Sequence, residues 1–182
     1  TPGLKKYFGV STTAFAISQV KTASRFQALS AEGNSLDGLN IHCAIVDELH
    51  AHRTRKVYDV LETATGARAQ PLIWNITTAG SDRSGICYEQ RTYLTKILEG
   101  TTQDDTYFGI IYSLDEEDDW TDPAVWAKAN PNYGVSIFPD DMERLCLKAR
   151  QMTSAQANFR TKRLSVWVNA DPVSYTHLTL PT

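Results

Sequence analysis

The sequence has no uninterrupted apolar segment that approaches the roughly 20 residues needed for a membrane-spanning helix. It also lacks an excess of one charge, because 18 basic and 21 acidic residues give a formal net charge of −3. The overall charge therefore gives no case for nucleic-acid binding, which would need a local basic patch or a basic domain elsewhere. With 182 residues and 42% hydrophobic content, the chain can bury the core of one domain or of parts of two.

Cysteine is scarce, and its positions exclude two kinds of framework. The three cysteines are odd in number and far apart, at Cys43, Cys87 and Cys146, and no C-x-x-C pair occurs. This spacing argues against a structural zinc site and against a set of disulfides. We therefore expect a reduced, intracellular setting for the protein.

The two ends carry little information about the fold. The chain begins at Thr1 and shows no signal-peptide pattern. Residues 172–182 share no pattern with the preceding sequence and resemble translated adapter or vector sequence. We interpret them as a non-native tail, leave them out of the fold argument, and expect the native chain to continue beyond about Asp171.

Hydrophobic patterns predict an α/β fold with a parallel sheet. Apolar strand-like runs alternate with amphipathic segments, and this order favours parallel strands joined by right-handed crossovers. Residues 41–46 are nearly all apolar, as expected for a central strand covered on both faces. Two shorter strand signals precede them, at residues 15–18 and 26–29. The expected strands are 41–46, 71–77 and 106–112, and the expected helices are 54–63 and 84–99.

The character of the chain changes after Leu114. A run of acidic residues at 115–119 leads into a stretch rich in tryptophan and proline. Helices are then predicted at about 139–151 and 154–164, each opened by a residue suited to a helix start. We interpret residues 115–171 as a helical linker towards a second domain that the chain does not include.

An acid pair ends the first apolar strand of the α/β region, because residues 41–46 are followed at once by Asp47 and Glu48. Ligands of α/β sheets bind at the carboxyl ends of parallel strands. The pattern is typical of the Walker B site of P-loop ATPases, in which one carboxylate holds Mg²⁺ and its neighbour prepares the attacking water. A plain alternative is a strand followed by an acidic helix cap, because the pattern is short.

Further polar residues follow the two strands. Asp47, Glu48 and the following Leu49-His50 match the DExH box of helicases, which strengthens the acid pair without adding a function. Thr77 and Thr78 end the next strand, where ATPases place a residue that senses the γ-phosphate, although threonine is also common at strand-to-loop transitions. His50 and His52 could form a metal pair, but no third ligand follows at a suitable spacing, which favours a polar loop beside a nucleotide.

The phosphate-binding loop of such ATPases, G-x-x-x-x-G-K-[ST], is absent from this sequence. Two glycine pairs have the spacing, Gly33 with Gly38 and Gly80 with Gly85. In both cases an apolar residue stands in place of the lysine that reaches the phosphates, and no hydroxyl for Mg²⁺ follows. We reject both as phosphate loops.

Several stretches, taken together and in this order, resemble the large subunit of tailed-phage terminases. The resemblance covers roughly residues 8–171 and is far more specific than the acid pair alone. It is carried by Ser35-Leu36-Asp37-Gly38-Leu39-Asn40, Val46-Asp47-Glu48-Leu49-His50, Trp74-Asn75-Ile76-Thr77-Thr78-Ala79-Gly80, Phe108-Gly109-Ile110-Ile111-Tyr112, Asp119-Trp120, Trp126, Ala129-Asn130-Pro131-Asn132, Gly134 and residues 159–167.

The resemblance implies an ATP-driven motor that packages viral double-stranded DNA into an empty capsid. Its ATPase domain is of the P-loop, ASCE, RecA-like type, and an RNase H-like nuclease follows. Carried over, Asp47 would hold Mg²⁺, Glu48 would activate water, and Thr77 and Thr78 would couple ATP hydrolysis to DNA translocation. Residues 1–114 would be the C-terminal part of the ATPase domain. The phosphate loop and arginine finger would lie upstream of Thr1, and the nuclease carboxylates downstream of residue 171.

The same resemblance implies partners and a location. The partners would be double-stranded viral DNA, the terminase small subunit, the procapsid portal and further copies in a homo-oligomeric ring. The protein would work in the host cytoplasm, docked transiently on the procapsid, without a membrane. Because half of the ATP site is missing, we expect this chain alone to be inactive.

Two other functions stay open from the residues themselves. A DExH helicase fragment would require further helicase motifs and a second RecA-like domain after Thr78, and the stretch after Leu114 does not resemble one. A non-catalytic α/β interaction module would leave Asp47 and Glu48 exposed or capped by backbone amides. The ATPase interpretation instead predicts that the acid pair converges with Thr77 or Thr78 on one crevice.

Overall fold

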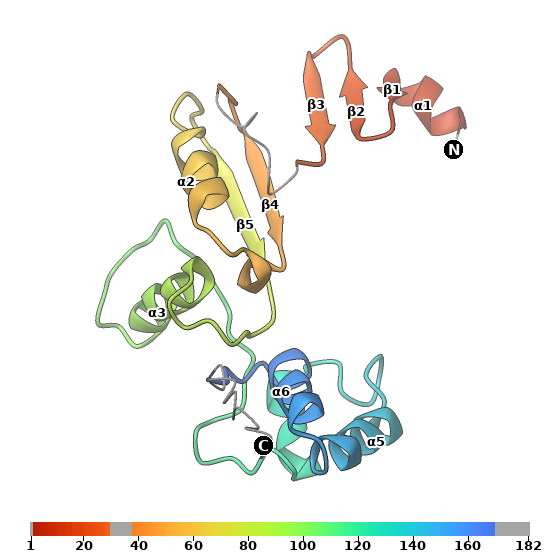
Figure 1. Ribbon diagram of the computed structural model, residues 1–182. Coiled ribbons are helices and arrows are strands. Elements are labelled where there is room, and N and C mark those ends of the chain that lie inside the picture. Colours follow the sequence, from red (N-terminus) through yellow and green to blue (C-terminus); the bar gives the residue numbers. More distant parts are fainter. Residues whose placement is uncertain (1, 30–37, 170–182) are drawn as a thin grey trace, which may run out of the picture. The chain divides into compact units, whose positions relative to one another are not determined.

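The computed structural model describes residues 2–29 and 38–169. The chain divides into two compact units, residues 1–39 and residues 40–182, and each is described by itself. Figure 1 shows their helices and strands in chain order. No helix within the described residues is both long and apolar enough to cross a bilayer.

The first unit is a small antiparallel sheet preceded by a helix. Helix α1 (Pro2–Phe8) leads into strands β1 (Val10–Thr12), β2 (Ala16–Gln19) and β3 (Ser24–Gln27), which pair in the order β1-β2-β3. The Gln19 side-chain oxygen accepts hydrogen bonds from the Thr22 amide at 2.8 Å and hydroxyl at 3.0 Å, which closes the turn between β2 and β3. The strand predicted at 15–18 is confirmed to within one residue, whereas the one predicted at 26–29 begins and ends two residues earlier.

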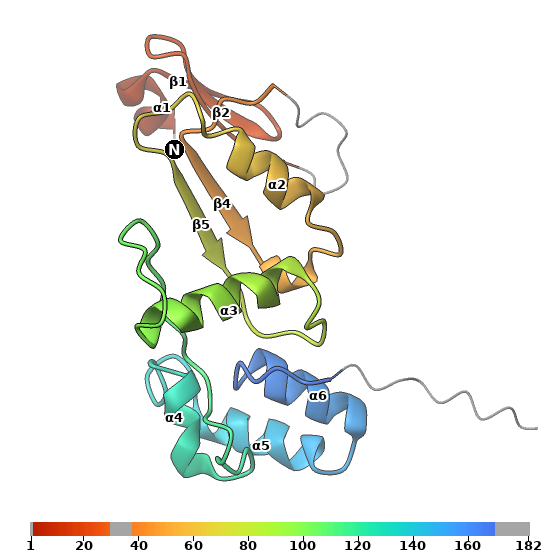
Figure 2. The same cartoon turned by 90° about the vertical axis from the view of Figure 1, so that its left-hand side faces the viewer.

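The second unit begins with a parallel pair of strands, β4 (Cys43–Asp47) and β5 (Leu72–Ile76), in a register that sets Asp47 opposite Ile76. Helix α2 (Lys56–Thr63) makes the connection between them, and α3 (Ile86–Leu98) lies across their carboxyl ends (Figure 2). The predicted α/β order, with a parallel sheet and helices between its strands, is confirmed for these elements.

The expectation that the strand at 41–46 is covered on both faces is wrong. Along β4, Ala44 and Val46 are buried, whereas Ile45 is 57% exposed. The α2 side chains Val57, Tyr58 and Leu61 are buried, and the Tyr58 hydroxyl accepts a hydrogen bond from the Asn75 side-chain amide of β5 at 3.2 Å. The opposite face keeps apolar side chains exposed, because no described helix of this unit lies over it; they are Ile45, Leu72, Trp74 and Ile76.

The prediction of a strand at residues 106–112 is also wrong. Thr106 lies in a turn, and residues 107–112 form no helix and pair with no strand among the described residues; they run along α3 instead. Tyr107 donates a hydrogen bond from its hydroxyl to the Gln90 side chain at 2.8 Å, and a Cβ on Gly109 would lie only 2.4 Å from Leu94 Cδ2. Aromatic and β-branched residues favour a strand, but a strand also needs a free neighbouring edge to pair with. In this structure the segment packs on α3 and does not pair with a strand.

The segment after Leu114 folds as a helical group around its own core. It contains η2 (Pro123–Val125), α4 (Trp126–Ala129), α5 (Pro139–Ala149) and α6 (Thr153–Lys162). Pro139 stands at the start of α5 and two acids follow in its first turn, as helix starts favour. The predicted helices at 139–151 and 154–164 are confirmed. The buried core consists of Trp126, Met142, Cys146, Ala149, Phe159 and Leu164.

The chain returns from α6 to the loop after β5 and is fixed there by Trp167. The Trp167 ring packs edge-on against Tyr88 of α3 with centroids 4.9 Å apart, and its carbonyl accepts a hydrogen bond from Arg83 at 3.0 Å. The Val168 amide bonds the Gly80 carbonyl at 3.3 Å. The helical group is thus anchored close to the carboxyl ends of the parallel strands.

Candidate active site at the ends of β4 and β5

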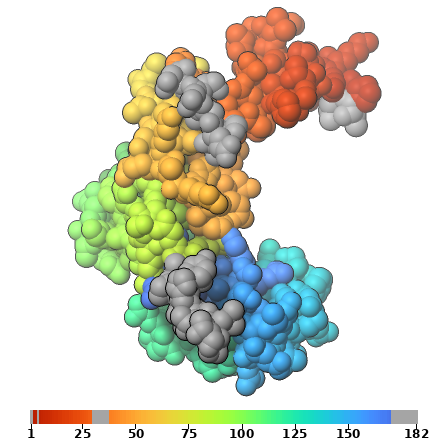
Figure 3. Space-filling model, viewed as in Figure 1, coloured from red at the N-terminus to blue at the C-terminus, as the bar shows by residue number. Residues whose placement is uncertain are grey.

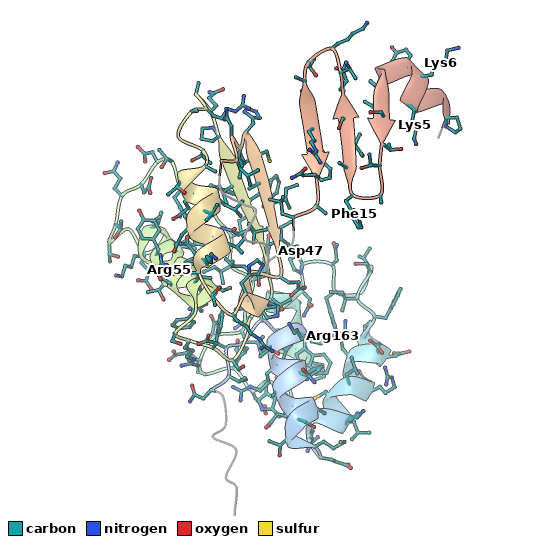
Figure 4. The ribbon with its side chains drawn as sticks, turned by 45° about the horizontal axis from the view of Figure 1, so that its top comes forward. Lys5, Lys6, Phe15, Asp47, Arg55 and Arg163 are labelled. Atoms are coloured by element: carbon teal, nitrogen blue, oxygen red, sulfur yellow. The ribbon has the colours of Figure 1, made fainter. Side chains whose placement is uncertain are left out.

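Asp47 is the last residue of β4 and is exposed at the edge where parallel strands present ligands. Figure 4 shows it at the carboxyl end of the strand. Within residues 2–29 and 38–169, no side chain forms a hydrogen bond or ion pair with its carboxylate. An exposed carboxylate of this kind fits a hard cation such as Mg²⁺, which binds one or two protein carboxylates and keeps several waters.

Glu48 follows in a left-handed backbone conformation, with φ 53° and ψ 46°. Its amide still bonds the Ile76 carbonyl at 2.8 Å, which extends the parallel ladder by one residue, and the 3₁₀ turn η1 (Leu49–Ala51) then begins. A strand would point two successive side chains to opposite faces, and the left-handed turn ends that alternation. The conformation costs a non-glycine residue about 1–2 kcal/mol, and such strain clusters at functional sites.

The His50 ring contacts residues that follow each of the two strands. Its Nδ1 lies 3.1 Å from Glu48 Oε2 and 2.9 Å from Thr77 Oγ1. Its Nε2 contacts the ammonium of Lys162, which has no lone pair and can only donate. Nε2 must therefore accept, and the single ring proton of neutral His50 lies on Nδ1. Burial lowers the pKa of His50 below its usual value, and the nearby Lys162 charge lowers it further, which favours this neutral form.

Thr77 and Thr78 have different surroundings. The Thr77 hydroxyl accepts from the His50 amide at 3.1 Å and donates to the Thr78 carbonyl at 2.9 Å, so it ties the loop after β4 to the loop after β5. Thr78 Oγ1 lies 3.4 Å from Lys162 Nζ. The structure therefore brings Glu48 and Thr77 to His50, and Thr78 to the Lys162 ammonium that also contacts His50. This arrangement argues against a purely capping role for the acid pair.

Lys162 is the residue that the sequence patterns did not reveal. It is the last residue of α6, and its ammonium contacts His50 and Thr78 and lies 3.8 Å from Glu48 Oε2. In Figure 3 the blue surface near the C-terminal end of the described chain meets the orange surface of the segment after β4. Because 112 positions separate it from His50, no local motif could have indicated this contact.

The remaining candidates are the histidine pair and the glycine pairs. No group of three or more His, Cys, Asp or Glu side chains in the described part of the chain could hold a metal ion, so a site built on His50 and His52 has no further protein ligands there. Gly80 allows a close approach, since a Cβ there would lie 3.2 Å from His50 Cβ and 3.4 Å from the Trp167 ring. Gly33 lies outside the described residues, so that glycine pair is not tested by the structure.

Comparison with known families identifies the chain. Residues 9–96 match the model of the terminase large subunit ATPase domain, and residues 101–176 match that of the terminase large subunit endonuclease domain. The chain belongs to the terminase large-subunit family. The ATPase match includes the acid pair and both threonines, and the endonuclease match includes Lys162. That second match covers the segment interpreted above as a linker and extends into the segment interpreted as a non-native tail.

Individual proteins are also similar to this chain. Protein YmfN of Escherichia coli strain K12 is 46% identical over 134 residues, which are 74% of this chain and 30% of that protein. The terminase large subunit of Enterobacteria phage HK97 is 27% identical over 167 residues, 91% of this chain and 30% of that protein. The crystal structure of the HK97 large terminase superposes with a TM-score of 0.75 at 26% identity and covers 92% of this chain and 34% of that one. The chain thus spans about a third of the length of these relatives.

Proposed function

We propose that this segment forms half of the ATP-hydrolysing site of a terminase large subunit that packages double-stranded viral DNA. One observation carries the proposal. The parallel strand β4 ends in an exposed carboxylate, and the next residue, Glu48, turns in a left-handed conformation towards His50, whose ring contacts Thr77. Family membership makes nucleotide and divalent-metal chemistry the expected use of such a strand end.

Each residue has a role in this proposal. Asp47 would hold Mg²⁺, which offsets the negative charge of the ATP phosphates when it is bound. Glu48 orients the attacking water and accepts its proton, while the Nδ1–H of His50 donates to the carboxylate and fixes its direction. Thr77, which contacts the His50 ring, and Thr78, which lies near Lys162, would connect the phosphate end of the site to the loop after β5. ATP and Mg²⁺ are the cofactors implied.

The proposal extends to the parent protein. We propose that residues 1–114 complete an ATPase domain of the P-loop, ASCE type with upstream sequence, that residues 115–171 act as a linker, and that residues 172–182 are a non-native tail. The partners proposed are viral DNA, the small subunit, the portal and other copies in a ring, in host cytoplasm at the procapsid. Support for the ATPase part comes from the ATPase-domain match over residues 9–96. The endonuclease-domain match over residues 101–176 supports a terminase parent but does not favour the linker or the non-native tail.

The chain alone lacks a G-x-x-x-x-G-K-[ST] loop, and we propose that it neither binds ATP tightly nor hydrolyses it. The 182-residue chain would be titrated with a fluorescent ATP analogue and assayed for phosphate release. We expect no saturable binding in the micromolar range. A turnover that disappears in Glu48→Gln would instead show that a complete site lies within this chain.

The base assignment is tested in a full-length terminase that carries these residues. Glu48→Gln should abolish ATP hydrolysis while leaving ATP binding largely intact, because the amide keeps the shape of the side chain but cannot take a proton. Glu99→Gln, an exposed carboxylate at the end of α3, is the matched control and should hydrolyse ATP like the wild type. Retained hydrolysis in Glu48→Gln, measured by phosphate release, would refute the assignment.

A further inference from the structure

The ammonium of Lys162 lies among side chains of the proposed hydrolytic site although it comes from the helical group. It contacts His50 Nε2 and lies 3.4 Å from Thr78 Oγ1 and 3.8 Å from Glu48 Oε2. Glu48 and Thr78 follow β4 and β5, whereas Lys162 ends α6. One side chain therefore connects the helical group to the ends of both parallel strands.

The position of Lys162 is fixed by the packing of the backbone on either side of it. Phe159 and Leu164 flank it in the sequence and are buried in the helical core. A few residues later, Trp167 packs on Tyr88 and accepts from Arg83. An isolated surface ion pair contributes little, but this lysine is held in place from both directions and meets three polar groups at once.

Donor and acceptor chemistry gives this contact a consequence for Glu48. An ammonium can only donate, so His50 must present a lone pair on Nε2 and carry its proton on Nδ1. That Nδ1–H faces Glu48 Oε2 at 3.1 Å and Thr77 Oγ1 at 2.9 Å. Without Lys162, the other neutral tautomer becomes available, and its bare Nδ1 would face the Glu48 carboxylate and repel it.

We propose that Lys162 is a positioning residue of the hydrolytic site: it holds His50 as the Nδ1–H tautomer and, through His50, orients the Glu48 carboxylate. ATP hydrolysis then depends on α6 being seated against the loop after β4. The inference rests on the proposed role of Glu48. It assigns to the helical group a direct part in ATP hydrolysis.

The test compares three variants of a full-length terminase that carries these residues. Lys162→Met should lower kcat for ATP hydrolysis about 10- to 100-fold, as expected when a reacting group loses its orientation, with KM for ATP changed less than about twofold. Lys162→Arg should restore much of kcat, because a cation returns to the same place. Arg163→Met, which removes a neighbouring cation that faces Asp141 of α5 at 3.7 Å, should behave like the wild type.

A double-mutant cycle separates positioning from direct action on the phosphate. If Lys162 acts through His50, the double variant His50→Leu/Lys162→Met should have the same kcat as His50→Leu alone, within about twofold. Additive losses would overturn the proposal, because they would mean that the lysine acts without the histidine. Lys162→Gln serves as a second variant, and thermal unfolding of every variant checks that it is folded.

The outcomes also separate this inference from the proposed function. If Glu48→Gln retains hydrolysis, the role of Glu48 fails and the inference fails with it. If Glu48→Gln is inactive while Lys162→Met keeps the wild-type kcat, only the role of Lys162 is refuted. A KM increase in Lys162→Met with kcat unchanged would also refute it, since that result indicates uniform substrate binding rather than orientation of the base.

Discussion

The left-handed backbone of Glu48 leads to an unusual order of stability among its substitutions. Glu48→Gly and Glu48→Ala remove the same carboxylate and its contact with His50. They differ in that alanine keeps the Cβ that makes φ 53°, ψ 46° unfavourable. Comparing these two variants therefore isolates the backbone strain from the loss of the side chain.

The magnitude follows from two opposing terms. The left-handed conformation costs alanine about 1–2 kcal/mol relative to glycine. Glycine loses more freedom on folding, and this offsets about 0.5–1 kcal/mol of that difference. We expect Glu48→Gly to be more stable than Glu48→Ala by roughly 0.5–1 kcal/mol, whereas at an ordinary position glycine is the less stable by a similar amount.

Urea unfolding of the 182-residue variants, followed by the fluorescence of the four tryptophans, gives the free energies of unfolding. The Glu48→Asn variant should fall between the other two, because asparagine tolerates this region better than alanine. If Glu48→Ala proves as stable as Glu48→Gly or more so, residue 48 is not held in a left-handed conformation. The explanation of how the acid pair turns into the site would then be wrong.

Two further results are expected around His50. Gly80→Ala places a Cβ 3.2 Å from His50 Cβ and 3.4 Å from the Trp167 ring. Chemical denaturation should therefore show a free energy of unfolding lower by about 1–3 kcal/mol. An unchanged free energy would mean that both neighbours move aside without cost. The pKa of His50 lies below its usual value, because burial and the Lys162 charge lower it more than the Glu48 charge raises it. The proposed site requires neutral His50, so we expect activity to be lost as the pH falls through this pKa. Lys162→Met should raise that pKa and move the acidic limb of the kcat/KM profile to higher pH; an unmoved limb would show that Lys162 does not act on His50.

The elements of the α/β region were predictable because their signals are local. Apolar runs ending in turn residues located β4 and β5, and the acid pair marked the end of β4. Helix starts with proline and early acids located α5 in the same way. Such features depend only on residues that are neighbours in the sequence, so one sequence is enough to predict them.

The errors occurred where distant residues decide the structure. The apolar and aromatic residues at 106–112 favour a strand, but whether they join a sheet depends on a free strand edge, and Gly109 packs on Leu94 instead. An apolar run likewise does not tell whether both faces of a strand are covered, and Ile45 is exposed.

The candidate site was predictable in part for the same reason. Asp47, Glu48, Thr77 and Thr78 follow consecutive parallel strands, so the topology alone brings them to one edge of the sheet. The left-handed turn at Glu48 has no sequence signal, because glutamate is not a residue that favours it. Lys162 is brought to His50 only by the packing of a helical group whose core involves residues from 126 to 164.

The helical group leaves and rejoins the α/β part of the chain at nearly the same point. The Ser113 hydroxyl, just before it, donates to the Ser165 carbonyl, just after it, at 3.0 Å, and Ser165 has a positive φ of 51°. The two chain segments that join the helical group to the α/β part are thus bonded to each other where they cross. Together with the Trp167 contacts, this crossing sets where α6 ends relative to the loop after β4, and therefore where Lys162 meets His50.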